Sequence, residues 1–142
     1  MTPADVVGEA LTWMGTPYRH QASAKGLGCD CLGLICGVWR ALYQYELPAP
    51  HDYAPDWNCD GGGERLLAGV RQHFRPCSAE APLHGRLLVF RWRPHWPARH
   101  MGIGVNDDHF IHAYEGGGGV VTSFLVPQWR RRIAGIFAFP NI

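Results

Sequence analysis

The sequence predicts an α+β domain in which N-terminal helices pack on one face of a C-terminal antiparallel sheet of about five strands. Apolar residues recur three and four positions apart in the first half of the chain, and after Pro82 they alternate with polar residues. Helical segments therefore come first and strands later. The length of 142 residues lies within the usual range for one globular domain, so we expect a single domain over 1–142.

A first helix is predicted over residues 3–14. Thr2 and Asp5 have the spacing of a capping box, with a proline at the first helical position between them. Gly15 can end the helix with a positive φ angle, and the proline two residues later cannot continue it. We therefore expect a sharp turn after the first helix that exposes the side chain of Tyr18.

Residues 19–28 are expected to form a loop that leads into a second helix, from Cys31 to about Tyr45, with Asp30 as its N-cap. The stretch 46–63 contains three prolines and three consecutive glycines, so it is predicted to be an irregular insert. A short third helix is expected over 64–74. The alternating pattern that follows predicts strands at 86–92, 100–105, 109–114, 120–125 and 133–139.

Cys31 is expected to stand at the N-terminus of the second helix. A helix N-terminus carries about half a unit of positive charge, which favours a thiolate and makes a cysteine nucleophilic. The neighbouring carboxylate of Asp30 opposes the thiolate unless Asp30 is engaged elsewhere. The backbone N–H of Cys31 has no partner within the helix and is a candidate donor to an oxyanion.

Two histidines are expected to share one face of a β-hairpin. If 106–108 form a three-residue turn, Gly102 lies opposite His112, and His100 and His112 become diagonal neighbours within reach of each other. A turn one residue shorter or longer puts them on opposite faces. Gly102 is expected to leave open space beside His100. We assign Cys31 as nucleophile, His100 as general base and later acid, and His112 as the residue that orients His100.

Two other interpretations of these residues remain open. Cys31 and the histidines are also compatible with buried or structural roles. Alternatively, Cys29, Cys31 and Cys36 with a histidine form a zinc site. The three cysteines lack Cys-x-x-Cys spacing, so we expect no metal and no other cofactor. The five cysteines form an odd set, and we expect no disulfide scaffold.

Charge and hydropathy exclude several classes of protein. The formal net charge of +1 argues against general nucleic-acid binding. Four arginines and no acid fall within 86–106, and 130–132 form a second cluster. These arginines face solvent, an anionic polymer or a partner protein. The longest apolar runs are far shorter than the ~20 residues of a membrane span, so none is expected.

Four motifs follow one another along the chain: Gly-Thr-Pro-Tyr at 15–18, Asp-Cys-x-Gly-Leu at 30–34, His-x-Gly-Ile at 100–103 and Phe-Ile-His-Ala at 110–113. In this order they resemble the NlpC family of papain-like bacterial cell-wall cysteine peptidases. The resemblance implies hydrolysis of peptidoglycan stem peptides, commonly after γ-linked D-glutamate, through a thioester acyl-enzyme.

The resemblance also implies roles for individual residues. Cys31 is the nucleophile, His100 the base and His112 the third polar residue. Tyr18 lines the substrate site, and Asp30 helps to bind the free amine of a stem peptide. The sequence departs from the family pattern at two positions: Leu32 replaces a serine, and Arg86 stands where a Gly-Asp pair commonly precedes the first strand.

A narrower resemblance concerns the compact length, the segment 20–23 and the ending 129–135, which are similar to peptidases encoded among tail genes of phages and gene transfer agents. It implies partners in a phage-like tail tip or baseplate. The chain is then made in the bacterial cytoplasm without a signal peptide and acts in the periplasm or cell wall. The alternatives are a catalytically retired tail-tip protein, and a thiol amidase or acyltransferase with another substrate.

Overall fold

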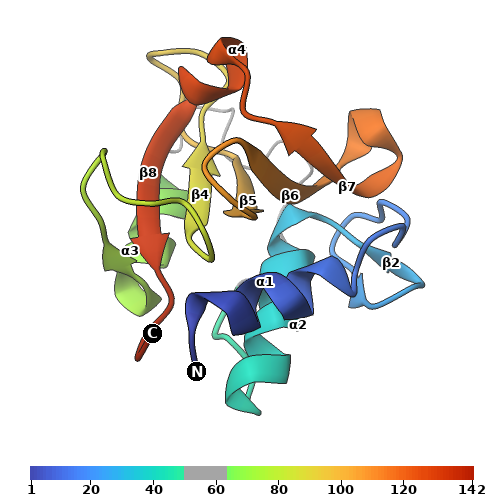
Figure 1. Ribbon diagram of the computed structural model, residues 1–142. Helices are drawn as coiled ribbons and strands as arrows, with labels where there is room; N and C mark the ends of the chain where they lie inside the picture. Colours follow the sequence, from blue (N-terminus) through green and yellow to red (C-terminus); the bar gives the residue numbers. More distant parts are fainter. Residues whose placement is uncertain (50–63) are drawn as a thin grey trace.

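An antiparallel sheet with helices against one face forms the frame of the protein (Figure 1). The computed structural model describes residues 1–49 and 64–142. The helices are α1 (Pro3–Leu11), α2 (Cys31–Tyr43), α3 (Arg65–His73) and α4 (Pro127–Arg130), with a 3₁₀ turn, η1 (Glu115–Gly117). The strands are β1 (Ser23–Ala24), β2 (Gly28–Cys29), β3 (Arg75–Pro76), β4 (Leu87–Phe90), β5 (His100–Gly104), β6 (His109–Tyr114), β7 (Gly119–Phe124) and β8 (Ile133–Ala138).

The main sheet has the strand order β3-β8-β4-β5-β6-β7, with neighbours antiparallel. It contains the five predicted strands and one more, the two-residue edge strand β3. Proline lacks a backbone N–H and is tolerated at a sheet edge, which fits Pro76 in β3. The strands β1 and β2 pair separately, in a segment that the sequence predicted to be a loop.

The helices begin where the sequence predicts and end slightly earlier. The Thr2 backbone N–H donates to Asp5 Oδ2 at 2.8 Å, as expected for the capping box of α1. This helix ends at Leu11, because residues 12–14 tighten into turns with bonds to the third residue back. Gly15 then has a φ of +81°. The helix α2 ends at Tyr43, and α3 lies within its predicted range. Most of the predicted insert, 50–63, lies outside the described residues.

The sheet has an apolar core on each face. On one face, buried residues of α1, α2 and α3 pack against β4, β5 and β6, as the sequence predicted. The residues at the centre of this core include Val6, Ala10, Leu34, Val38, Leu67, Val89, Met101, Ile103 and Ile111. The opposite face carries a smaller core beneath Trp129 of α4. It consists of Leu83, Leu88, Phe90, Phe110, Leu125 and Ile136.

The β5–β6 hairpin has the predicted register. Ile103 pairs with Ile111 and Gly104 with Phe110, which places Gly102 opposite His112. Asn106 closes the turn by accepting the backbone N–H of Asp108 at 2.8 Å.

Across residues 1–49 and 64–142, no helix combines the length and apolar content that a bilayer crossing requires.

Candidate active site

A cleft of about 570 Å³ lies between the start of α2 and the ends of β5 and β6. It brings together four of the five side chains that the sequence predicted for the site. Cys31 comes from the first turn of α2, His100 from the start of β5, and Tyr18 and Asp30 from the loops before α2. The other residues that line the cleft are His20, Leu32, Trp92, Arg99, Ala113, Tyr114, Glu115 and Gly116.

Tyr18 is held near Cys31 by a short parallel backbone bridge to Cys29, two residues before the thiol. The Cys29 N–H donates to Pro17 O, and the Arg19 N–H donates to Cys29 O, each at 3.0 Å. These bonds fix the chain on both sides of Tyr18 against the strand that leads into α2. The motif Gly-Thr-Pro-Tyr thus places a half-buried tyrosine at the wall of the cleft beside the thiol.

Asp30 is the N-cap of α2, as predicted. Its Oδ1 accepts the Gly33 N–H at 2.7 Å, and its Oδ2 accepts the Gln21 N–H at 2.8 Å. The Nδ1 of His20 lies 3.8 Å from the same Oδ2. The carboxylate is therefore engaged by backbone donors, and only 3% of the residue is exposed.

Gly33 allows the preceding loop to pack against the start of α2. A Cβ atom at this position would overlap the carbonyl oxygen of Ala22. The Ser23 hydroxyl also donates to the Gly33 carbonyl oxygen at 2.6 Å. The glycine of the Asp-Cys-x-Gly motif is thus required by a close backbone approach at the first turn of α2, where Cys31 lies.

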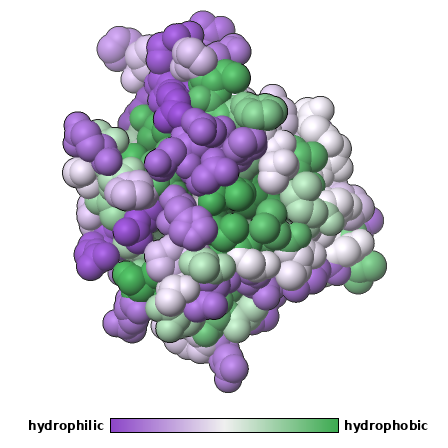
Figure 2. Space-filling view, in the orientation of Figure 1, coloured by the Kyte–Doolittle hydropathy of each residue, from purple (hydrophilic) through white to green (hydrophobic). Residues whose placement is uncertain are grey.

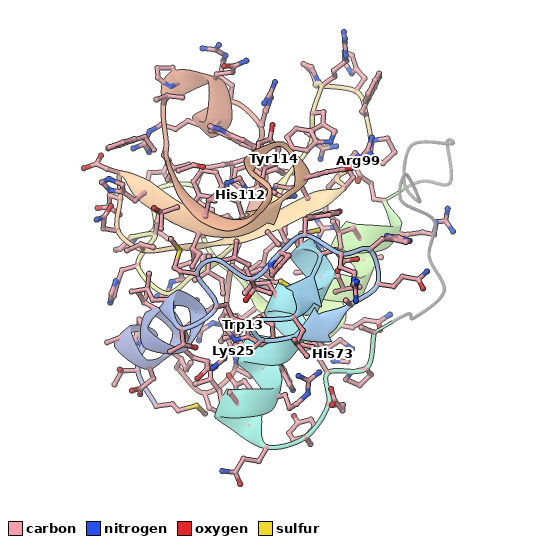
Figure 3. The ribbon with its side chains drawn as sticks, turned by 90° about the vertical axis from the view of Figure 1, so that its right-hand side faces the viewer. Trp13, Lys25, His73, Arg99, His112 and Tyr114 are labelled. Atoms are coloured by element: carbon pink, nitrogen blue, oxygen red, sulfur yellow. The ribbon has the colours of Figure 1, made fainter. Side chains whose placement is uncertain are left out.

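His100 and His112 form the start of a buried hydrogen-bond chain. His100 Nε2 lies 2.8 Å from His112 Nδ1, and His112 Nε2 lies 2.8 Å from the hydroxyl of Ser123 on β7. The histidines are 5% and 0% exposed. In Figure 3 His112 and Tyr114 lie close together on the sheet, and Arg99 lies at the start of the neighbouring strand. The sequence predicted the pair of histidines and missed Ser123.

The space over Gly102, which the sequence predicted to be open, is filled by neighbouring atoms of β6. A Cβ atom on Gly102 would lie 3.0 Å from the Phe110 ring and 3.2 Å from His112 Cβ. Gly102 therefore lets the rings of β6 approach β5 closely. Gly102 thus serves the close packing of the two strands that carry His100 and His112.

Aromatic rings enclose the two histidines. The Trp92 ring stacks on His100 with centroids 5.3 Å apart and an interplanar angle of 23°. The Tyr114 ring stacks on His112 at 5.1 Å and 15°. Trp129 of α4 meets His112 edge-on at 5.3 Å. These rings fix both imidazole planes and keep water away from the hydrogen-bond chain.

Burial keeps the reactive groups neutral. It lowers the pKa of His100 well below its ordinary value, with the charges of His112 and Arg99 acting in the same direction. Burial also lowers the pKa of His112 to about 4. For Cys31, burial and then the charge of Asp30 raise the pKa to about 12, although backbone hydrogen bonds lower it.

In the unliganded site, burial and the charge of Asp30 act against the predicted stabilisation of a Cys31 thiolate by the helix N-terminus. Cys31 is partly buried, and the adjacent carboxylate of Asp30 acts against the helix end even though Asp30 is hydrogen-bonded. The cleft holds a thiol and a neutral imidazole.

The remaining lining residues give the cleft charges of both signs. Tyr18 keeps its phenolic proton, because burial and then the charge of a Cys31 thiolate raise its pKa above the ordinary value. Glu115 and Arg99 also act on the pKa of Tyr18 in opposite directions, which places both near it. Arg99 directly precedes His100, and Glu115 follows Tyr114. The sequence feature that could have identified Arg99 and Glu115 as cleft residues is their position next to His100 and Tyr114.

The cysteines considered for zinc do not gather. Within residues 1–49 and 64–142, no three His, Cys, Asp or Glu side chains form a group able to hold a metal. The four described cysteines are free thiols, and Cys29 is buried beneath the site. Leu32, which departs from the family pattern, is only 8% exposed and forms an apolar wall of the cleft. Arg86, the second departure, lies outside the cleft lining.

Comparison with known proteins places this cleft in a family. Residues 15–137 match the model of the NlpC/P60 family. The chain is 25% identical over 127 residues to the murein DD-endopeptidase MepS/murein LD-carboxypeptidase of Escherichia coli K12, covering 89% of this chain and 57% of the relative. It is 24% identical over 133 residues to murein DD-endopeptidase MepH of the same strain, covering 91% and 43%. The chain thus spans about half the length of these curated relatives.

Solved structures share the fold. An NlpC/P60 family protein from Bacillus cereus superposes with a TM-score of 0.68 at 18% identity, over 98% of this chain and 40% of that one. The NlpC/p60 domain of the peptidoglycan hydrolase SagA superposes with a TM-score of 0.61 at 22% identity, over 98% of both chains. The predicted papain-like α+β fold is confirmed by these likenesses. From the match over 15–137, the chain belongs to the NlpC/P60 family.

Proposed function

We propose that the chain is a cysteine peptidase that hydrolyses amide bonds in peptidoglycan stem peptides through a thioester intermediate. The observation that carries this proposal is the hydrogen-bond chain from Ser123 through His112 to His100, which ends in the same cleft as Cys31. Membership of the NlpC/P60 family and the names of its murein endopeptidase relatives support the substrate class.

The tautomers follow from the task of His100. To take the Cys31 proton at Nδ1, His100 must carry its own proton on Nε2 and donate it to His112 Nδ1. His112 then carries its proton on Nε2 and donates to the Ser123 hydroxyl. Each ring thus fixes the tautomer of the next, and the base reaches the thiol in its accepting form.

The first half of the reaction moves one proton twice. As Cys31 Sγ attacks the carbonyl carbon, its proton passes to His100, and the carbonyl oxygen becomes an oxyanion near the Cys31 backbone N–H. The imidazolium of His100 then gives that proton to the leaving nitrogen, and the C–N bond breaks. A thioester remains on Cys31.

Water completes the cycle. His100 removes a proton from water, which adds to the thioester carbon, and the proton returns to Sγ as the C–S bond breaks. The acid half of the substrate leaves, and the thiol and neutral imidazole are restored. Both groups are neutral in the unliganded cleft, so the charged pair exists only during turnover.

Two residues are proposed to bind the substrate. Tyr18 presents a phenolic O–H on the cleft wall, suited to a carbonyl oxygen of the peptide. Asp30 supplies negative charge in the cleft, suited to a free amine, and Glu115, which also lines the cleft, adds to that charge. Leu32 replaces a polar contact there with an apolar one, so it is expected to influence which bond is cleaved.

The test compares Cys31→Ala with Cys77→Ala on purified muropeptides, with products identified by mass spectrometry. Cys77 is a partly buried free thiol next to the edge strand β3 and provides the matched control. The wild type and Cys77→Ala should release identical fragments, and Cys31→Ala should release none while unfolding at the same temperature. Equal digestion by Cys31→Ala would contradict the proposal, and the fragment masses identify the bond.

We further propose that a phage-like particle carries the enzyme, in its tail tip or baseplate, to the periplasm or cell wall after synthesis in the cytoplasm. The support is the resemblance of 20–23 and 129–135 to tail-gene peptidases. Mass spectrometry of purified particles from the source bacterium should detect the chain. Its presence only in secreted or lipid-anchored form would reject this route.

A further inference from the structure

Two arginine-rich segments, which the proposed chemistry does not use, lie side by side in the folded chain. The Arg91 N–H donates to the Arg132 carbonyl oxygen at 2.8 Å and joins the end of β4 to the segment after α4. In Figure 2 hydrophilic side chains gather over the upper part of the molecule, where α4 lies. A hollow of about 290 Å³ is lined there by Arg91, Arg93, Arg131 and Arg132, together with Trp92 and Gln128. These four arginines are called the arginine rim below.

Most of the charge of the arginine rim has no carboxylate partner among the described residues. Arg91 pairs with Glu64 at 2.7 Å. Within residues 1–49 and 64–142, no ion pair joins Arg93, Arg131 or Arg132 to an acid, and no acid lines the hollow. Like charges gathered in one place repel one another, and a bound anion would relieve this repulsion.

Stacking on indole rings holds two of these arginines in position. The Arg93 guanidinium lies 5.0 Å from the centroid of Trp96. The Arg132 guanidinium lies 5.3 Å from Trp92 and 5.4 Å from Trp129. A stacked guanidinium keeps its N–H groups directed outward along its edge, so less side-chain entropy is lost when it binds a carboxylate.

The arginine rim is continuous with the catalytic cleft. A second hollow, of about 530 Å³, is lined by Trp92, Arg93, Trp96, Tyr114 and Arg132. It shares Trp92 and Tyr114 with the cleft, and it shares Trp92, Arg93 and Arg132 with the hollow of the arginine rim. A ligand that extends out of the cleft over Trp92 therefore meets the guanidinium groups next.

We propose that the arginine rim binds carboxylates of the peptide substrate that lie outside the bond being cleaved. The substrate of this surface is then a peptide with free carboxylates, and forked guanidinium donors match such groups in geometry and charge. The proposal rests on the proposed peptidase function for the identity of the ligand, and its continuity with the cleft favours the same substrate over a separate anion.

The test measures binding, so that it does not depend on turnover. Full-length Cys31→Ala protein is titrated with a stem tetrapeptide, and with the same peptide whose carboxyl groups are amidated, by calorimetry. Adding Arg93→Gln and Arg131→Gln, two exposed positions, should weaken binding of the carboxylate peptide about tenfold and leave the amidated peptide unchanged. Arg75→Gln, an exposed arginine on the edge strand β3, is the matched control and should change neither.

Each outcome decides the proposal. Loss of affinity with added salt for the carboxylate peptide alone supports it. Equal affinity for both peptides, no binding of either, an equal loss from Arg75→Gln, or preference for poly(glycerol phosphate) overturns it. Cleavage is measured separately with the unmutated chain. If that chain binds through the arginine rim and cleaves nothing, the peptidase function fails and the arginine rim stands.

Discussion

At the scale of single residues, the proposed mechanism starts from groups that are neutral in the unliganded cleft. Burial raises the pKa of the Cys31 thiol and lowers those of His100 and His112, so these three groups are neutral in the resting cleft. A neutral pair must be correctly protonated to react. Proton placement then becomes the property that the surrounding hydrogen bonds control, and Ser123 is the last member of that chain.

Replacing Ser123 with alanine should slow turnover and leave substrate binding unchanged. Without an acceptor for its Nε2 proton, His112 can carry the proton on Nδ1, where it opposes the Nε2–H of His100. The fraction of His100 able to accept from Cys31 then falls, and kcat should drop about tenfold or more at constant KM. Steady-state kinetics on a stem peptide across pH 5 to 9 measures this.

Two further variants separate proton placement from packing. Thr122→Ala alters the adjacent, exposed residue of β7 and should behave as the wild type. Ser123→Thr restores the hydroxyl and should recover most of kcat. If Ser123→Ala lowers the melting temperature and raises KM without a change in kcat, Ser123 has a packing role only.

At the scale of elements, those features were predictable that depend on residues close together in the sequence. The β5–β6 hairpin was predictable, because a three-residue turn fixes the parity that brings His100 and His112 to one face. The pairing of β7 with β6 was less predictable. Four consecutive glycines, the last of them the first residue of β7, allow several registers, so Ser123 was missed although His112 pairs with its near neighbour Val121.

Other features escaped prediction because they are tertiary or too short. The four-residue helix α4 cannot show a helical period, yet its Trp129 packs against both histidines. Trp92 stacks on His100 although no sequence pattern links them. The Cys31 pKa depends on burial, which outweighs the helix end whose effect was predictable. The position of Cys31 was thus available from the sequence, and its protonation state was not.

Substitution by alanine should have opposite effects on stability at two helical glycines, Gly33 and Gly8. Gly33→Ala puts a Cβ into the Ala22 carbonyl oxygen and 3.1 Å from Asp30 Oδ1, so α2 must shift away from the loop. We expect a loss of about 3 kcal/mol in the free energy of unfolding, and loss of activity. Gly8→Ala in α1 meets nothing within 4 Å and should gain about 0.5–1 kcal/mol. Urea unfolding measures both, and similar values for the two variants would refute the steric argument.

At the scale of the whole molecule, the sheet separates two kinds of environment. One face carries the helices and the larger apolar core, while the other carries the smaller core, the two histidines with their aromatic neighbours and, beyond Trp92, the arginine rim. The reactive thiol approaches this second environment from the start of α2. Titratable groups are therefore buried at the boundary of the two cores, and folding is coupled to their protonation.

Stability should accordingly fall on both sides of neutral pH. Below about pH 6.5, His100 and His112 are protonated in the unfolded chain and remain neutral in the native state, so unfolding takes up protons. The free energy of unfolding therefore decreases as pH falls toward 4, by up to about 1.4 kcal/mol per pH unit for each histidine. Above pH 9 the unfolded chain loses the Cys29 and Cys31 protons that the native state keeps, and stability drops again. Urea unfolding of the wild type, His112→Asn and the exposed control His95→Gln from pH 4 to 10 measures this. An acid slope in His112→Asn as steep as in the wild type would show that His112 is not buried neutral.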